Sequence, residues 1–276
     1  MIVYFFGISK AAARIYDRIS IHGKNPMAEV FSQKQEEEAS MNKISPELLS
    51  RCDKAACCAN EFVILPPDGD SGFEEYFLYK ARRSRVKKHL VLREEQTRLI
   101  LKYPSPMAGD AVFNRFFDSP AVVAANQEFE GCFGIDLTEY LNRTSDPRLD
   151  QLVQYIRRHP AVTYVLFVYT QDLRKGTSLL GALDRYFPLQ PLQIPLPDTD
   201  RLTEYLSDLV GGDGGFEKPV EEEIRAFFFS AASGYDTADF LARELRERGF
   251  NGEKQVLLDA LAYMKDVTDH RERFGF

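Results

Sequence analysis

The stretch VTYVLFVYT, residues 162–170, is an almost uninterrupted run of β-branched, aromatic and other apolar residues. Such a run is typical of a central strand in a parallel sheet, because helices cover both faces of that strand. It is preceded by an amphipathic helix pattern, DPRLDQLVQYIRRH at 146–159, with one apolar stripe. A second helix pattern, SLLGALDRYF at 178–187, follows it. This order predicts βαβ units and a parallel sheet.

The same alternation extends in both directions along the chain. CFGIDL at 132–137 and LQPLQIPL at 189–196 have the length and composition of strands, and DTDRLTEYLSDLV at 198–210 begins like a capped helix. After the glycine-rich GGDGGF at 211–216, only helical patterns follow, at 218–231, 236–248 and 253–268. We therefore predict a three-layer α/β core over residues 1–210 and a small all-helical lid domain over 217–276.

Composition restricts the class of protein. The chain has 276 residues, 44% of them hydrophobic, and a net charge of −7. These values favour a folded acidic protein and argue against bulk binding to nucleic acid or membrane surfaces. No basic leader and no apolar run of the roughly 18 residues needed to span a bilayer is visible. We expect a cytoplasmic protein with no membrane partner, and four reduced cysteines rather than a metal site.

The first residues, IVYFFGISKAAAR at 2–14, have the order strand, glycine turn, lysine and helix in which phosphate-binding loops are built. The following region, 22–128, fits the alternation poorly and is interpreted as atypical or inserted. Within it, Ser45 and Pro46 open a helix, EFVILPPDGDSG at 61–72 is a short strand running into a turn, and 74–104 carries two or three further strand candidates. The segment 105–118 is expected to hold a short helix, and 121–126 another strand.

Two stretches suggest a family. GALDRYFPLQPLQIPLPDTDRLTEYLSDL at 181–209 places an arginine–aromatic pair before a strand and a Pro-Asp pair at the start of a helix, and SGYDTADFLARELRERG at 233–249 looks like a lid helix. In this order the chain resembles the AAA+ ATPases, a branch of the P-loop NTPases, over roughly residues 1–20 and 130–270. The resemblance implies a P-loop NTPase-like core, with ATP and Mg²⁺ as the ligands of the family.

The resemblance assigns a phosphate loop to Gly7, Ser9 and Lys10. The loop departs from the family pattern (Walker A) because it is too short, and because Ala11 stands where a hydroxyl would hold Mg²⁺. A tight strand-to-helix turn is the alternative interpretation. Asp136 matches the metal-binding carboxylate that ends a strand (Walker B), but Leu137 replaces the water-activating Glu.

The remaining family positions fall on four residues. Thr170 or Gln171 would contact the γ-phosphate after the strand at 162–170, without the usual Asn. Arg185 resembles the arginine that reaches a neighbouring subunit's nucleotide, and Arg243 a sensing arginine of the lid. A turn residue and solvated arginines are the alternative interpretations. The nucleotide-binding set, if retained, is thus Gly7, Ser9, Lys10, Asp136, Thr170, Gln171, Arg185 and Arg243.

A basic run, KARRSRVKKH at 80–89, stands out in an acidic chain. It could bind phosphate or a nucleic-acid backbone through Arg82, Arg83, Arg85, Lys87 and Lys88. The alternative is an edge strand protected by charge.

Three defects coincide in the nucleotide positions: the loop length, the metal hydroxyl and the water-activating carboxylate. The sequence therefore predicts a degenerate AAA+-like protein that does not hydrolyse ATP and acts as a scaffold or regulator through protein partners. Two alternatives stay open: an ATP-binding or ATP-hydrolysing protein with a remodelled phosphate loop, and a phosphate or nucleic-acid binding protein that uses residues 80–89. No catalytic residue, cofactor or metal site is assigned, and an oligomer is compatible with the sequence.

Overall fold

The computed structural model describes residues 41–52, 59–83, 100–118, 132–160, 162–210, 215–230 and 233–274. The chain divides into two compact units, Met1–Glu38 and Ala39–Phe276, and all described residues belong to the second. The predicted strand at 2–6, the helix at 8–20, the proposed phosphate-loop residues Gly7, Ser9 and Lys10, and the strand at 121–126 lie outside the described residues.

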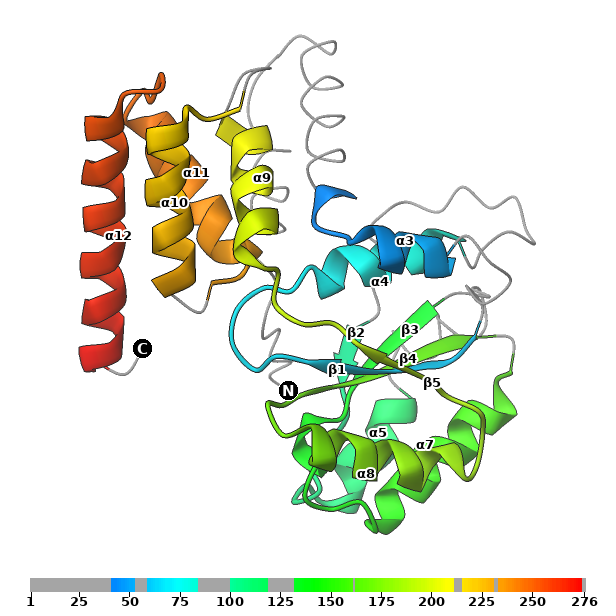
Figure 1. Ribbon diagram of the computed structural model, residues 1–276. Helices are drawn as coiled ribbons and strands as arrows, with labels where there is room; N and C mark the ends of the chain where they lie inside the picture. Colours follow the sequence, from blue (N-terminus) through cyan, green and yellow to red (C-terminus); the bar gives the residue numbers. More distant parts are fainter. Residues whose placement is uncertain are drawn as a thin grey trace, which may run out of the picture. The chain divides into compact units, whose positions relative to one another are not determined.

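Five parallel strands form one sheet in the order β2-β3-β4-β1-β5 (Figure 1). The strands are β1 (Glu61–Leu65), β2 (Ile100–Lys102), β3 (Cys132–Asp136), β4 (Thr163–Tyr169) and β5 (Gln190–Gln193). β4 is the longest strand, and all of its residues except the last, Tyr169, are buried, as its apolar run predicts.

Helices cover both faces of the sheet (Figure 1). The helices of the α/β part are α3 (Pro46–Cys52), α4 (Phe73–Arg83), α5 (Asp110–Phe117), α7 (Pro147–Arg158) and α8 (Leu173–Asp184). Alternate strand residues point to opposite faces, so Phe62 and Leu166 pack in the core beneath α7 and α8. Val63 and Val165 pack in a second core with α3 and α4. This alternation fixes the three layers of the structure.

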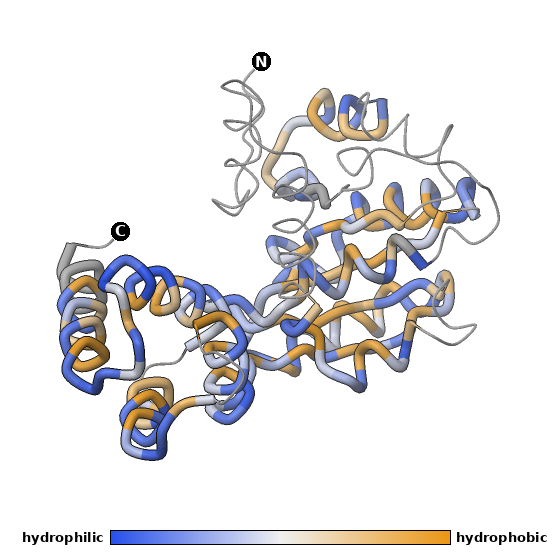
Figure 2. The backbone as a smooth tube through the Cα atoms, turned by 90° about the horizontal axis from the view of Figure 1, so that it is seen from above, coloured by the Kyte–Doolittle hydropathy of each residue, from blue (hydrophilic) through white to orange (hydrophobic). Residues whose placement is uncertain are grey.

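The C-terminal part has a core of its own. It consists of α9 (Thr199–Val210), α10 (Lys218–Ser230), α11 (Tyr235–Glu247) and α12 (Lys254–Phe274). Leu206 of α9, Ile224 of α10, Leu241 of α11 and Leu257 of α12 are fully buried in one cluster. Figure 2 shows these helices changing between hydrophobic and hydrophilic colours along their turns, as amphipathic helices do. The predicted fold class, a parallel α/β core followed by an all-helical part, is confirmed.

The expected boundary between the two parts differs from the packing. The prediction assigned α9 to the α/β core, but Leu202, Tyr205 and Leu206 lie in the helical cluster. The helical part therefore begins at Thr199. A sequence pattern shows that a helix is amphipathic but not which core receives its apolar side.

Two predictions for region 22–128 are wrong. The segment 73–83 is a helix rather than a strand, because its apolar residues recur at helical spacing: Phe73, Tyr76, Phe77 and Ala81 are buried. The strand β1 is no insertion but lies inside the sheet, between β4 and β5. No helix in the described part of the chain is long and apolar enough to cross a membrane.

Candidate functional site

The strand order defines where a ligand site would lie. The chain leaves β1 for the edge strand β2, whereas it leaves β4 for β5 on the other side of β1. In open α/β sheets, ligands bind outside the carboxyl ends of the strands at the point where this direction changes. That point is between β1 and β4, so the loop 66–72 after β1 and the turn at 170–172 after β4 form the candidate site. The phosphate loop expected at 2–14 lies outside the described residues and stays a prediction; within the described residues, the glycine-containing loop at this point is 66–72.

The loop PPDGDSG, residues 66–72, has the glycines of a tight turn but not the chemistry of a phosphate loop. Gly69 and Gly72 have φ angles of 80° and 77°, which residues with a side chain rarely adopt. A phosphate loop would continue with Lys and then Ser or Thr. Here Phe73 follows and is buried, with its ring centroid 4.8 Å from that of Phe167 on β4. Glu74 stands in the hydroxyl position.

Backbone amides of this loop are already hydrogen-bonded to carboxylates. The N–H of Gly72 donates to Asp70 Oδ1 at 2.8 Å, and the N–H of Asp70 donates to Asp236 Oδ1 at 3.0 Å. The carbonyl of Asp70 accepts from the N–H of Tyr235 at 2.9 Å. Gly234 allows this approach, because a Cβ there would lie 2.3 Å from the Asp70 nitrogen. The amino end of α11 thus occupies the loop where a phosphate would need the amides.

A buried lysine completes what we call the clasp: Lys43, Asp70, Glu75, Asp236 and Asp239. The Lys43 side chain is 9% exposed, and its Nζ lies 3.0 Å from Asp70 Oδ2, 2.9 Å from Asp239 Oδ2 and 3.6 Å from Glu75 Oε1. The clasp therefore joins the segment before α3, the loop after β1, α4 and α11.

Negative charge exceeds positive charge in the clasp. Burial alone would lower the pKa of Lys43, but the carboxylates of Asp70, Glu75 and Asp239 outweigh it and raise that pKa well above its usual range. Burial raises the pKa of Glu75 above its ordinary value, and Lys43 only partly offsets this. Glu75 Oε2 is buried without a hydrogen-bond partner. An anionic ligand would meet further repulsion here.

Asp136 lies at the end of β3, as predicted, but its carboxylate is engaged locally. Asp136 Oδ1 accepts from the N–H of Thr138 at 2.8 Å and from its hydroxyl at 2.6 Å. The Thr138 hydroxyl oxygen in turn accepts from the N–H of Tyr169 at 3.0 Å. Leu137 is fully buried, and Glu139 pairs with Lys102 at 2.7 Å, which lowers the pKa of Glu139. The described residues supply no water-activating base at this strand end.

The turn after β4 is built around Thr170. Its hydroxyl oxygen accepts from the N–H of Asp172 at 2.9 Å, and Asp172 caps α8 through the N–H of Arg174, while Gln171 is exposed. Tyr169, the last residue of β4, is 39% exposed. Burial, and then the charges of Asp136, Glu74 and Asp70, raise its pKa to about 12. Carboxylates from three segments thus act on one tyrosine at the end of β4.

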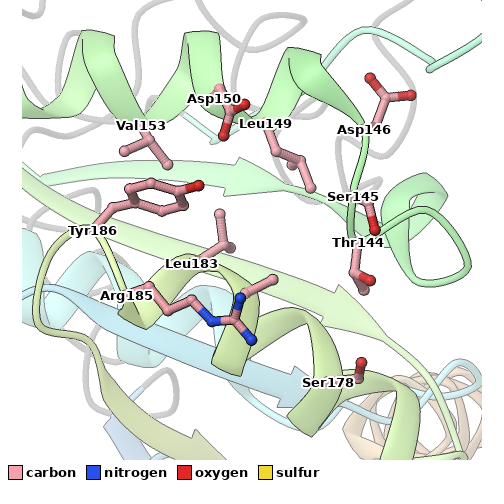
Figure 3. Close-up of a pocket in the computed structure, with 11 residues that line it drawn as sticks. Thr144, Ser145, Asp146, Leu149, Asp150, Val153, Ser178, Leu183, Arg185 and Tyr186 are labelled. Carbon is pink, nitrogen blue, oxygen red and sulfur yellow. The ribbon is translucent and has the colours of Figure 1, made fainter.

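The two arginines of the predicted set do not contact the clasp. Arg185 is exposed at the end of α8 and lines a groove between α7 and α8 (Figure 3). The Arg243 guanidinium stacks on Phe240, 4.6 Å from the ring centroid. Neither forms an ion pair with another described residue. Asp136, Thr170 and the loop 66–72 all lie at the carboxyl ends of the strands. Arg185 and Arg243 do not form a common site with them.

The basic run at 80–89 is only partly described. Lys80 is buried in the core, with its Nζ 3.3 Å from Glu61 Oε1. Arg83 is exposed on α4, and its Nη2 donates to the Tyr79 hydroxyl at 3.0 Å. Arg82 belongs to α4, but its side chain lies outside the described residues, as do Arg85, Lys87 and Lys88. The edge-strand interpretation is wrong for residues 80–83, which are helical.

A scan against family models and a search of curated proteins gave no match. Among solved structures, domain III of the replication initiation protein DnaA from Thermotoga maritima is similar with a TM-score of 0.49 and 10% identity, over 82% of this chain and 95% of that one. The ORC2 protein of Aeropyrum pernix in its ADP form is similar with a TM-score of 0.46 and 13% identity, over 82% of this chain and 67% of that one.

Both structures are AAA+ ATPases, the family that the sequence resembles. At these identities and TM-scores the likeness supports no inference about activity, ligand or partner.

The residues of the clasp were not predicted from the sequence. Lys43, Asp70 and Asp239 carry no motif, and they are far apart in the chain. One signal was present: the strand EFVIL is followed by a glycine turn and by a helix pattern with buried aromatics, which is the same order of elements as at 2–14. Reading 73–83 as strand hid this second candidate.

Proposed function

We propose that this chain is a degenerate AAA+-like protein that does not hydrolyse ATP and acts as a scaffold or regulator through protein partners. One observation carries the proposal: the amides of Asp70 and Gly72 are held by the carboxylates of Asp236 and Asp70, and no lysine or hydroxyl follows Gly72. The residues at the end of β1 do not fit a nucleotide with Mg²⁺.

Electrostatics supports this reading. A nucleotide triphosphate needs amides, a lysine and a metal to balance its charge during phosphoryl transfer. At the end of β1 a triphosphate would instead meet Asp70 and Glu75, with Lys43 already paired to both. Like charges a few ångströms apart in a partly buried site repel by several kcal/mol at an effective dielectric constant of about 20. A site of this kind selects against the ligand.

What the clasp does instead supports the proposed role through protein partners. In nucleotide-binding folds, backbone amides of such a loop and of the following helix bind the phosphate groups of the ligand. In this chain, side chains of the protein itself join the α/β core to the helical part, since Lys43 Nζ contacts Asp70 of the loop and Asp239 of α11. Because these contacts need no ligand, the protein would present the same surface to a protein partner whether or not nucleotide is present.

Calorimetry of the full chain with ATP and Mg²⁺ tests the proposal. We expect no measurable heat and no ATP turnover. Asp236→Ala frees the Asp70 amide and should still not bind, because no lysine follows Gly72. Binding at micromolar affinity or better by the wild type would overturn the proposal.

Lys10→Ala would then locate such binding. Its loss in Lys10→Ala would support the alternative of an ATP-binding protein that uses residues 2–14. If ATP binding persists in Lys10→Ala but is lost in Asp70→Lys, the nucleotide binds at the end of β1. That result would contradict the expected electrostatic repulsion of the nucleotide by Asp70 and Glu75.

A further inference from the structure

A groove of about 340 Å³ lies between α7 and α8 (Figure 3). Leu149, Val153 and Leu183 form its floor, and all three are buried core residues. Polar side chains from the two helices and from the segment before α7 form its walls: Thr144, Ser145, Asp146, Asp150, Ser178 and Arg185. The groove is separate from the clasp, because they share no residue.

Opposite charges line the groove without pairing. Asp150 projects from α7 and Arg185 from the end of α8, on opposite walls (Figure 3). Neither side chain has a hydrogen bond or ion pair to another described residue, and both are exposed. Asp146 caps α7 through the N–H of Arg148. Tyr186, beside Arg185, is 47% exposed and adds an aromatic surface over the apolar floor.

We infer that this groove docks an extended segment of a partner protein, in which an acidic and a basic residue flank an apolar one. The acidic residue pairs with Arg185, whose planar guanidinium can bind a carboxylate through two hydrogen bonds. The basic residue pairs with Asp150, and the apolar residue lies on Leu183 and beside Tyr186. Arginine and tyrosine are enriched among the residues that dominate binding energy at interfaces.

A protein segment fits these walls better than a small organic ligand. Pockets for such ligands are lined mainly by hydrophobic and aromatic side chains and have volumes of about 300–1,000 Å³. The groove, at about 340 Å³, lies at the small end of that range. Here the walls are polar and carry both signs of charge. The inference rests on the proposed role in protein binding and names the surface and the chemistry of the partner.

A phage-displayed library of random short peptides, selected on the full chain, is the probe. Selected peptides should carry an acidic and a basic residue around an apolar one. Their affinity, measured by fluorescence anisotropy, should fall about tenfold or more in Arg185→Glu and in Asp150→Lys. Arg157→Glu is the matched control, because Arg157 is exposed on α7 and does not line the groove. It should bind like the wild type.

A charge-swapped peptide gives a second readout. Replacing the acidic residue of a selected peptide by lysine should abolish binding to the wild type and restore it with Arg185→Glu. The inference is overturned if no peptide is selected, if the selected peptides lack the acidic residue, or if all three variants bind equally. Because the calorimetry with ATP does not involve the groove, these results are independent of the test of the proposed function.

Discussion

Replacing Lys43 by methionine removes the one cation that the clasp places among Asp70, Glu75 and Asp239. The Nζ atom lies within 3.0 Å of two of these carboxylates and 3.6 Å from the third. Methionine has nearly the same length but no charge, so the packing against Tyr205 and Tyr235 is retained, whereas the cation–π contacts at 5.7 Å are lost. The variant therefore isolates the charge.

The expected loss of stability is about 3 kcal/mol. Removing one partner of a buried ion pair costs about 3–5 kcal/mol, because the other charge stays buried and unpaired. Water reduces this cost here, since the side chains of Asp70 and Asp239 are 29% and 44% exposed. For a chain of about this size, 1 kcal/mol corresponds to about 2 °C in Tm, so a decrease of about 6 °C is expected.

Urea denaturation followed by far-UV circular dichroism measures the free energy of unfolding. Lys254→Met is the matched control: Lys254 pairs with Glu223 at 2.8 Å but is 47% exposed, so its loss should cost about 0.5 kcal/mol or less. Adding Asp239→Asn to Lys43→Met should cost less than the sum of the single changes, because a repelling carboxylate is removed.

A Lys43→Met protein as stable as Lys254→Met would refute the reasoning. It would show that the carboxylates of the clasp relax into water when the lysine is absent. The ion pairs of Lys43 would then contribute little to joining the α/β core to the helical part, which would depend on the hydrogen bonds between Asp70 and the amino end of α11.

Three further predictions concern other parts of the structure. Burial raises the pKa of Glu75 in the folded state. The contribution of Glu75 to stability is therefore fully present below about pH 4.5, and it is lost as pH rises through the higher pKa of the folded state. Urea titrations at several pH values should show that the stability of the wild type relative to Glu75→Gln decreases from pH 4 to pH 7. Gly234→Ala should destabilise the protein by about 1–3 kcal/mol, because its Cβ would lie 2.3 Å from a backbone nitrogen. Gly181→Ala should stabilise the protein by about 0.5–1 kcal/mol, because Gly181 is at an exposed helix position and its Cβ would meet no atom within 4 Å. Equal effects of the two changes in thermal unfolding would contradict this. Lys80→Met should cost about 3 kcal/mol, because Glu61 would stay buried with only the Tyr76 hydroxyl at 2.9 Å and the half-buried Arg51 at 3.7 Å as described partners. An unchanged urea midpoint would show that Lys80 does not stabilise the fold.

Much of the fold could be predicted because its signals are local. The helix at 146–159, the strand at 162–170 and the all-helical end of the chain were predicted within a few residues of their observed bounds. Ser45 was predicted as a helix cap, and its hydroxyl accepts from the N–H of Leu48 at 3.4 Å. Capping, apolar periodicity and glycine turns act over a few residues, so the sequence displays them directly.

The candidate site could be predicted only in part. Asp136 and Thr170 were placed correctly at the ends of their strands, because polar residues that end apolar strands are visible in the sequence. The loop at the end of β1 was missed because two strand–turn–helix patterns compete in this chain, and only the strand order shows that the second one lies inside the sheet, between β4 and β5. Strand order depends on pairing between distant segments.

The sequence by itself determined most of the strands and helices from residue 132 onward, that the sheet is parallel, and that the usual residues for ATP hydrolysis are absent near Asp136. Only the tertiary structure decided what stands in place of a nucleotide. Lys43 and Asp239 are 196 residues apart in the chain, and their side chains meet because the amino end of α11 packs against the loop after β1. Carboxylates can hold loop amides, and a lysine can neutralise those carboxylates, only where folding brings them within hydrogen-bonding distance.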